Sequence, residues 1–207
     1  DIIYLPIIIL LSIVQYFLSA WRWYFIAHNT NTKIMYRDAV KYYYISGFLN
    51  NILPTGIMGD IYRTMNIKIN NQSTTNFLKS FQSVIFERLS GQITLVITFI
   101  ISLGIFFLVN QRYEAFGYVL LLIIISMLII KLFFISNQQN KYIINFKQIF
   151  SGGCFYKHFF LSLIIVLTYI TTYIICAFSL DLDIDIISFF VFAPIILFSM
   201  TLPVSIG

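Results

Sequence analysis

Long apolar runs separated by shorter polar segments dominate the chain. Several of these runs approach the roughly 20 residues that a helix needs to cross about 30 Å of hydrocarbon. The runs from Ile123 to Ile130 and from Leu161 to Val166 are apolar on every face. A strand of a membrane barrel would alternate apolar and polar positions instead. The pattern therefore predicts an all-α fold, a polytopic transmembrane helical bundle.

The apolar runs also locate the membrane-spanning helices. We expect these helices at about Tyr4 to Ala27, Ile93 to Val109, Phe116 to Ile135, Phe159 to Leu180 and Ile186 to Leu202, the last of which contains Pro194. Between the first and second lies a longer and less hydrophobic region, from His28 to Ser90.

Basic residues indicate the side of the membrane on which the connecting segments lie. They gather in two segments, with Lys33, Arg37, Lys41, Lys68 and Lys79 in one and Lys141, Lys147 and Lys157 in the other. By the positive-inside rule, both segments face the cytoplasm. The region from His28 to Ser90 must then cross the membrane an even number of times or not at all. We predict a re-entrant hairpin over 39–69, with one half-helix from Ala39 to Leu53 and another from Ile61 to Ile69.

Helix-breaking and polar residues cluster at the turn of this predicted hairpin. Glycine and proline interrupt helical hydrogen bonding there, and polar side chains are costly inside a membrane unless they serve a use. The candidate substrate-binding residues are Asn50, Asn51, Pro54, Gly56, Gly59, Asp60, Arg63, Glu87 and Arg88. Transporters build substrate sites from broken helices of this kind.

Asp60 and Arg63 are three residues apart, so they share one face of a helix and can form an ion pair. Asp60 can also cap the second half-helix, which is a purely structural use. In the functional alternative, Arg63 and free N–H groups of the turn from Gly56 to Gly59 bind a lipid phosphate. Both uses remain open from the sequence.

Glu87 and Arg88 precede the apolar run that begins at Ile93, so we expect them at or just inside the cytoplasmic boundary. A structural interpretation makes them an interfacial pair, with the Arg88 side chain reaching towards the headgroups. In the functional interpretation, Glu87 neutralises Arg63 and leaves Arg88 for the substrate.

Other polar and aromatic residues favour structural roles. The segment from Trp21 to Tyr24 has the composition of an interfacial belt, so Arg22 is expected to anchor the helix end rather than contact a headgroup. Packing is the expected role of the residues from Tyr42 to Tyr44, although they could line a cavity. His28 and His158 are expected to be isolated loop residues.

The sequence predicts no catalytic residues, no metal site and no cofactor. Asp181, Asp183 and Asp185 alternate in a short loop, a weak metal pattern that also suits a solvated outward loop. The net charge of +5 comes from basic residues spread over connecting segments, which argues against nucleic acid as a partner. No nucleotide-binding loop or pair of nucleophile and base is recognisable.

Several short motifs carry a family resemblance over nearly the whole chain. They are Trp21-Arg22-Trp23, Gly47 with Asn51, Leu53-Pro54, Gly59-Asp60 with Arg63, Glu87-Arg88, and Leu202-Pro203-Val204-Ser205-Ile206-Gly207. With these motifs the chain resembles the membrane domain of lysylphosphatidylglycerol synthase/flippase proteins, of the multiple peptide resistance factor type. It departs where the family's paired glycines read Met58-Gly59, and where the glycine-rich continuation after the last motif is absent.

The resemblance implies one transmembrane domain over 1–207. We expect this domain to be a fragment that lacks an N-terminal span and a C-terminal continuation. The expected function is that of a flippase-like protein, which translocates or binds a polar-headed phospholipid. We expect this protein to cross the cytoplasmic membrane of a prokaryote several times. The alternative is the membrane subunit or domain of a lipid-modifying aminoacyl- or glycosyltransferase, and a third possibility is a scaffold that anchors such an enzyme. The expected partners are the lipid bilayer, a lipid substrate and a lipid-modifying enzyme.

Overall fold

The protein is described by a computed structural model in which every regular element of the described residues is a helix. The described residues are 2–30, 32–53, 57–70, 76–136, 146, 149–150, 152–182 and 185–201. The predicted all-α fold is confirmed. The basic residues Lys141 and Lys147 and the terminal motif 202–207 lie outside the described residues.

Eight helical elements form this part of the chain. They are the short 3-10 helix η1 (Ile2–Tyr4) and the α-helices α1 (Leu5–Asn29), α2 (Tyr36–Ile52), α3 (Met58–Asn70), α4 (Asn76–Val109), α5 (Tyr113–Ser136), α7 (Gly152–Ser179) and α8 (Ile186–Thr201).

Three of these helices are long and apolar enough to cross a membrane. They occupy Leu5–Asn29, Phe77–Val109 and Gly153–Ser179, and shorter apolar stretches run over Tyr113–Ile125 and Ile186–Ser199. The protein is therefore an integral membrane protein. The last helix, α8, has 16 residues and rises only about 24 Å, which is less than the thickness of the hydrocarbon core.

The predicted starts of two long helices were too late. Helix α4 begins at Asn76 rather than near Ile93, and α7 begins at Gly152 rather than near Phe159. Glu87 and His158 lower the local hydropathy in these regions. Both side chains are nevertheless buried and bonded within the protein, so the helices continue through them.

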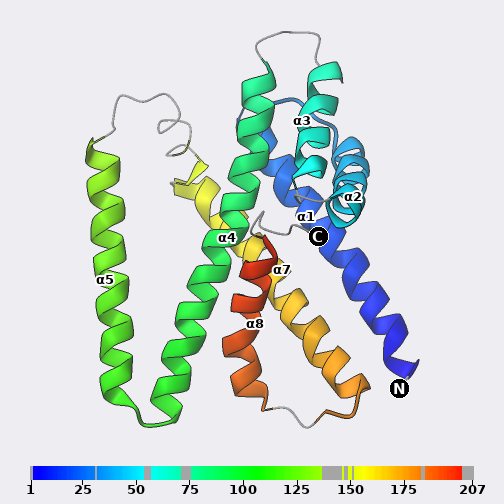
Figure 1. Cartoon of the computed structure of the whole chain (residues 1–207). Helices are drawn as coiled ribbons and strands as arrows, with labels where there is room; N and C mark the ends of the chain where they lie inside the picture. The colour runs from blue at the N-terminus through cyan, green and yellow to red at the C-terminus, as the bar shows by residue number, and fades with distance from the viewer. Residues whose placement is uncertain are drawn as a thin grey trace.

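The helices are arranged around the long helix α4 (Figure 1). Helices α2 and α3 form an antiparallel hairpin that packs against α1 and the first half of α4, while α8 packs against the second half of α4. Helix α7 contacts α1, α4 and α8. Helix α5 runs antiparallel to α4, so its end returns to the side on which α4 begins, as the positions of the basic residues predict.

Two apolar clusters stabilise the bundle, one around the hairpin and the other around α8. Around the hairpin, Trp23, Ala39, Tyr42, Ile67 and Val84 join α1, α2, α3 and α4. The second cluster joins α4, α7 and α8 and consists of Leu95, Val166, Ile170, Ala193 and Leu197. The polar residues described below lie between these clusters.

The hairpin depends on a close approach of α2 and α3 at Gly59. A Cβ atom at this position would lie 2.1 Å from the backbone oxygen of Ser46, and real Cβ contacts are never that short. The Gly59 N–H also donates a hydrogen bond of 2.7 Å to Asn50 Oδ1. Only glycine therefore allows α3 to begin directly against α2.

We expect Gly59→Ala to lower the free energy of unfolding by about 1–3 kcal/mol, because the added methyl forces the two helices apart. Thermal unfolding of the purified protein in detergent would measure this loss. Gly117→Ala in α5 is the matched control, since no atom lies within 4 Å of its Cβ position. Equal unfolding temperatures for the two variants would contradict the close approach at Gly59.

Candidate functional site

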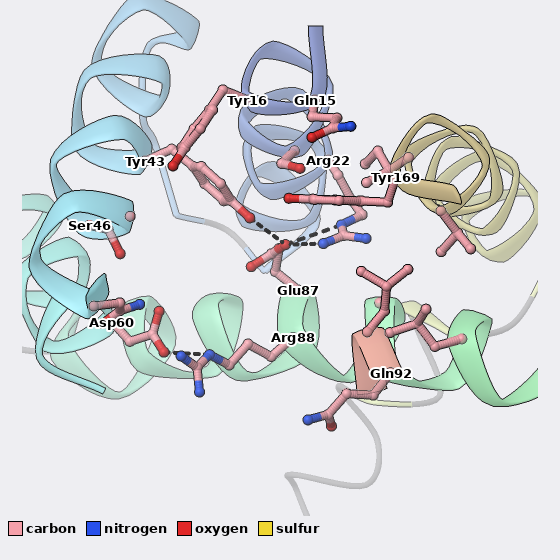
Figure 2. A pocket seen from close by; sticks show the side chains of 18 of the residues that line it. Gln15, Tyr16, Arg22, Tyr43, Ser46, Asp60, Glu87, Arg88, Gln92 and Tyr169 are labelled. Atoms are coloured by element: carbon pink, nitrogen blue, oxygen red, sulfur yellow. Dashed lines mark hydrogen bonds and ion pairs between the residues drawn. The ribbon is translucent and has the colours of Figure 1, made fainter. Parts of the chain in front are cut away.

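A cavity of about 650 Å³ lies between α1, α2, α3, α4, α7 and α8 (Figure 2). Both polar and apolar side chains form its wall. The polar and charged residues that line it are Gln15, Tyr16, Ser19, Arg22, Tyr43, Ser46, Asn50, Asn51, Asp60, Arg63, Glu87, Arg88, Gln92, Tyr169 and Tyr173. Leu197 of α8 also lines the cavity.

Glu87 on α4 binds two arginines from two other helices. Arg22 on α1 donates from Nε to Glu87 Oε1 at 3.1 Å, and its Nη2 contacts the same oxygen. Arg63 on α3 donates from Nη1 to Glu87 Oε2 at 3.3 Å. Only 2% of the Glu87 side chain is exposed, so this carboxylate joins α1, α3 and α4 in the protein interior.

Asp60 extends this arrangement into a network of five charged side chains. The Asp60 carboxylate pairs with Arg63 Nη2 through one oxygen and with Arg88 Nε through the other. The charges thus alternate from Arg22 through Glu87, Arg63 and Asp60 to Arg88. Three guanidinium groups and two carboxylates leave the network with a net charge of +1.

Two aromatic rings hold Arg63 at the centre of this network. Its Cζ lies 4.9 Å from the Trp23 ring centroid and 4.7 Å from the Tyr43 ring centroid. Both distances fall within the range of cation–π attraction. The Arg63 Nε atom is buried and has no hydrogen-bond partner among the described residues, so one guanidinium donor is unused.

The structure tests the pairings that the sequence predicted for these charges. The Asp60–Arg63 pair and the Glu87–Arg63 pair are both confirmed. Glu87 is buried within the protein in the first half of α4, and its position relative to the membrane boundary stays a prediction. Arg88 was expected to be available to bind the substrate. It pairs instead with Asp60, and 30% of its side chain is exposed.

The predicted hairpin residues reach the cavity in different ways. Asn50 and Asn51 both line it, but Asn50 Oδ1 already accepts the Gly59 N–H. The sequence had suggested that this N–H group is free to bind a phosphate, but the structure shows it bound to Asn50. Pro54 and Gly56 lie outside the described residues.

The contribution of α1 to the cavity was not predicted from the sequence. Arg22 was expected at the membrane interface, whereas it is buried and bound to Glu87. A signal was present, because the buried residues Gln15, Ser19 and Arg22 follow one another at spacings of four and three. This spacing puts a polar stripe on one face of an otherwise apolar helix. Packing was the expected role of Tyr43, but its ring lines the cavity and lies against Arg63, as the alternative interpretation allowed.

His158 is connected to Arg22 by a chain of hydrogen bonds through two serines. It is buried in α7, so its predicted position in a loop was wrong. Its Nε2 lies 3.1 Å from the Ile149 carbonyl oxygen, and its Nδ1 lies 2.9 Å from Ser90 Oγ. Ser90 Oγ lies 3.1 Å from Ser162 Oγ, which accepts a hydrogen bond of 3.1 Å from Arg22 Nη1.

The Ile149 carbonyl fixes the direction of this hydrogen-bond chain. A carbonyl only accepts, so His158 Nε2 carries the proton and Nδ1 of the neutral ring accepts from Ser90. Ser90 in turn accepts from Ser162, which accepts from Arg22. Neither His158 nor Ser90 lines the cavity, so this pair positions Arg22 rather than acting on a ligand.

The described residues contain no group of three or more His, Cys, Asp or Glu side chains that could hold a metal ion. Of the alternating aspartates, Asp183 lies outside the described residues, and Asp185 caps α8. The hydrogen bonds from the Ser188 hydroxyl and backbone N–H hold the pKa of the exposed Asp185 carboxyl below its usual range. The geometry of Asp185 is therefore that of a helix cap.

We expect Glu87→Gln to lower the free energy of unfolding by about 3–5 kcal/mol, because it leaves two buried guanidinium groups without their shared carboxylate. Chemical or thermal unfolding in detergent would measure the change. Lys79→Gln, which alters an exposed residue of the same helix, is the control and should change stability by less than about 0.5 kcal/mol. Similar stability of Glu87→Gln and the wild type would contradict the central position of Glu87.

Comparison with known proteins identifies the family to which the chain belongs. No curated protein and no solved structure matches the chain. The family described as the lysylphosphatidylglycerol synthase TM region matches residues 1–207. Because this match covers the whole chain, the protein belongs to that family of membrane domains, which is associated with lipid modification or flipping.

Proposed function

We propose that this protein binds the polar headgroup of a phospholipid in the central cavity and provides its path between the two leaflets of a prokaryotic cytoplasmic membrane. The observation that carries the proposal is the net charge of +1 on the network that lines the cavity. Three guanidinium groups around one cavity favour an anion there, because charges interact strongly away from water. A bound phosphodiester would bring its negative charge beside them.

The side chains of the network suit a phosphate. Guanidinium groups bind phosphate oxygens with paired N–H donors, and these charge-assisted bonds are strong where water is excluded. Arg88 is the most exposed of the three arginines, with 30% of its side chain accessible, so we assign the first contact to it. Arg63 contributes a buried Nε–H that has no acceptor among the described residues.

The size of the cavity suits a headgroup rather than a whole lipid. Its volume of about 650 Å³ lies within the range of about 300–1,000 Å³ that is common for pockets of small ligands. The acyl chains would therefore remain in the surrounding bilayer. Asn50 and Asn51 would contact the headgroup from α2.

The helical hairpin gives the headgroup a place inside the membrane. At 17 and 13 residues, α2 and α3 rise about 25 Å and 20 Å, so each is too short to cross about 30 Å of hydrocarbon. We therefore propose that the hairpin over 39–69 is re-entrant. Gly47, Pro54, Gly56 and Gly59 would shape its break, as in transporters whose discontinuous helices surround a substrate site.

A second function is favoured by the family itself, whose name is that of a synthase. In this alternative, the domain is the membrane part of a lipid-modifying aminoacyl- or glycosyltransferase. The cavity would then present the lipid headgroup to that enzyme without moving it across the membrane.

We expect Arg63→Gln to slow lipid movement by about 10- to 100-fold, because a hydrogen bond to a charged group contributes about 1.5–3 kcal/mol. The measurement uses proteoliposomes that contain phospholipids labelled on an acyl chain, with a membrane-impermeant quencher to report the outer leaflet. The variants are compared at equal amounts of folded protein. Arg112→Gln, which removes an exposed arginine at the far end of α4, is the matched control.

Each outcome separates the candidate functions. Movement by the wild type and Arg112→Gln, with loss in Arg63→Gln, would support translocation through the cavity. No movement by the wild type for any phospholipid would favour the membrane part of an enzyme. Equal movement by the wild type and Arg63→Gln would exclude the cavity as the path.

A further inference from the structure

We infer that phospholipids enter the cavity sideways from the bilayer, through an opening between the end of α2 and α8. The headgroup then lies inside the cavity, while the acyl chains lie against exposed apolar side chains of these two helices. This inference rests on the proposed function, for which it names the entry of the substrate. Its basis is the packing of the helices around the cavity and the character of the side chains at its edge.

The packing of the helices indicates where the cavity opens. Helices α1, α4 and α7 all line the cavity and contact one another in pairs, so they form its back. The hairpin packs against α1 and α4, while the main contacts of α8 among the described residues are with α4 and α7 and not with the hairpin. In Figure 1, the hairpin and α8 both lie on the side of α4 away from α5. The opening therefore lies between α2 and α8, where Asn51 and Leu197 line the cavity from either helix.

The side chains that border this opening are apolar and exposed. On α2, Phe48 and Ile52 each directly follow a residue of the cavity wall and are 59% and 62% exposed. On α8, Ile196 directly precedes Leu197 of the wall and is 51% exposed. Exposed apolar side chains that gather at one place indicate contact with a membrane or a partner, because water solvates them poorly. In a membrane domain, these side chains fit the acyl chains of a lipid.

The basic residues of the hairpin lie at its other end. Arg37 and Lys41 are exposed near the start of α2. Ile52 lies eleven positions after Lys41, a distance of about 16 Å along a helix. By the positive-inside rule, the basic end belongs to the cytoplasmic side. The opening lies at the apolar end of the hairpin, which suits entry from the bilayer rather than from water.

The polar groups at the opening lie on its inner side. Asn51 is exposed, lines the cavity and directly precedes Ile52. A polar side chain beside exposed apolar ones is costly in hydrocarbon unless it has a use. Further inside, Arg88 and Asp60 lie together against α4 (Figure 2). Polar groups on the inner side and apolar groups on the outer side match the headgroup and the acyl chains of one phospholipid.

The first test asks whether the cavity is reached from the bilayer or from water. Gln92 lines the cavity on α4, and Gln92→Cys is made in a protein that carries Cys154→Ser and Cys176→Ser. The reagents are a phospholipid with a maleimide on its headgroup and a charged, membrane-impermeant maleimide present on both sides of the proteoliposome membrane. The control for water is Lys79→Cys, on the exposed start of α4. The control for hydrocarbon is Val96→Cys, an exposed position one turn after Gln92 and outside the cavity wall.

We expect the lipid reagent to modify Gln92→Cys faster than Val96→Cys. We expect the charged reagent to modify Gln92→Cys at least about tenfold more slowly than Lys79→Cys, because an ionised molecule enters apolar surroundings poorly. Equal rates of Gln92→Cys and Lys79→Cys with the charged reagent would overturn the inference, as would equal rates of Gln92→Cys and Val96→Cys with the lipid reagent. Asn51→Cys provides the same comparison if Gln92→Cys does not fold.

The second test locates the opening. Asn51→Cys and Ile196→Cys in one protein place a thiol on each side of it, and a reducible bismaleimide then joins α2 to α8. We expect this cross-link to slow lipid movement at least about tenfold, because a closed entrance limits every later step, and reduction should restore the rate. The control pair, Gly104→Cys with Phe116→Cys, joins α4 to α5, since the Cβ position of Gly104 lies 3.4 Å from the Phe116 ring. Cross-linking this pair should leave movement unchanged.

The outcomes distinguish this inference from the proposed function. If lipids move and the cross-link between α2 and α8 does not slow them, the inference fails while the proposed function stands. If no phospholipid moves in the wild type, the proposed function fails, and the labelling of Gln92→Cys still decides whether the cavity opens into the bilayer.

Discussion

The ion pairs of Glu87 connect three helices of the bundle, α1, α3 and α4. Arg22 reaches this carboxylate from α1 and Arg63 reaches it from α3, while Glu87 itself lies on α4. A buried charge that loses its partner is far more costly than a surface charge, so these helices are held in one relative orientation. The cavity between them exists because this orientation is kept, and its charged wall consists of the same side chains that hold it.

The apolar residues explain where this polar network can lie. One cluster, around Trp23 and Ile67, packs the hairpin against α1 and α4, and another, around Leu95 and Ile170, packs α8 against α4 and α7. The charged side chains and the cavity lie between these clusters, where residues of α2, α3, α4 and α8 line the cavity together. Gly59 permits the close approach of α2 and α3, since no larger residue fits against Ser46.

Much of this arrangement could be predicted from the sequence, and the failures have a common cause. The spacing of Asp60 and Arg63 indicated their pair, and the glycines around Asn50 and Asn51 indicated a broken hairpin. Hydropathy alone, however, treats every charged residue as if it faced water. It therefore placed Glu87 at a helix boundary and Arg22 at an interface, although each neutralises the other in the interior. Such a pairing joins residues that are far apart in the chain, and one sequence without aligned relatives gives no measure of it.

The hydrogen-bond chain behind Arg22 has a consequence for the charge of the cavity. All its hydroxyl groups point the same way, from Ser162 and Ser90 towards His158, so each presents its oxygen to the side of the arginine. Two aligned hydroxyl dipoles therefore stabilise the guanidinium cation much as the carbonyls at a helix C-terminus stabilise a bound cation. A proton on Nδ1 of His158 would turn the dipoles round and present hydrogen atoms to the same cation. The tautomer of one buried imidazole thus sets the polarity of the environment in which Arg22 holds its charge.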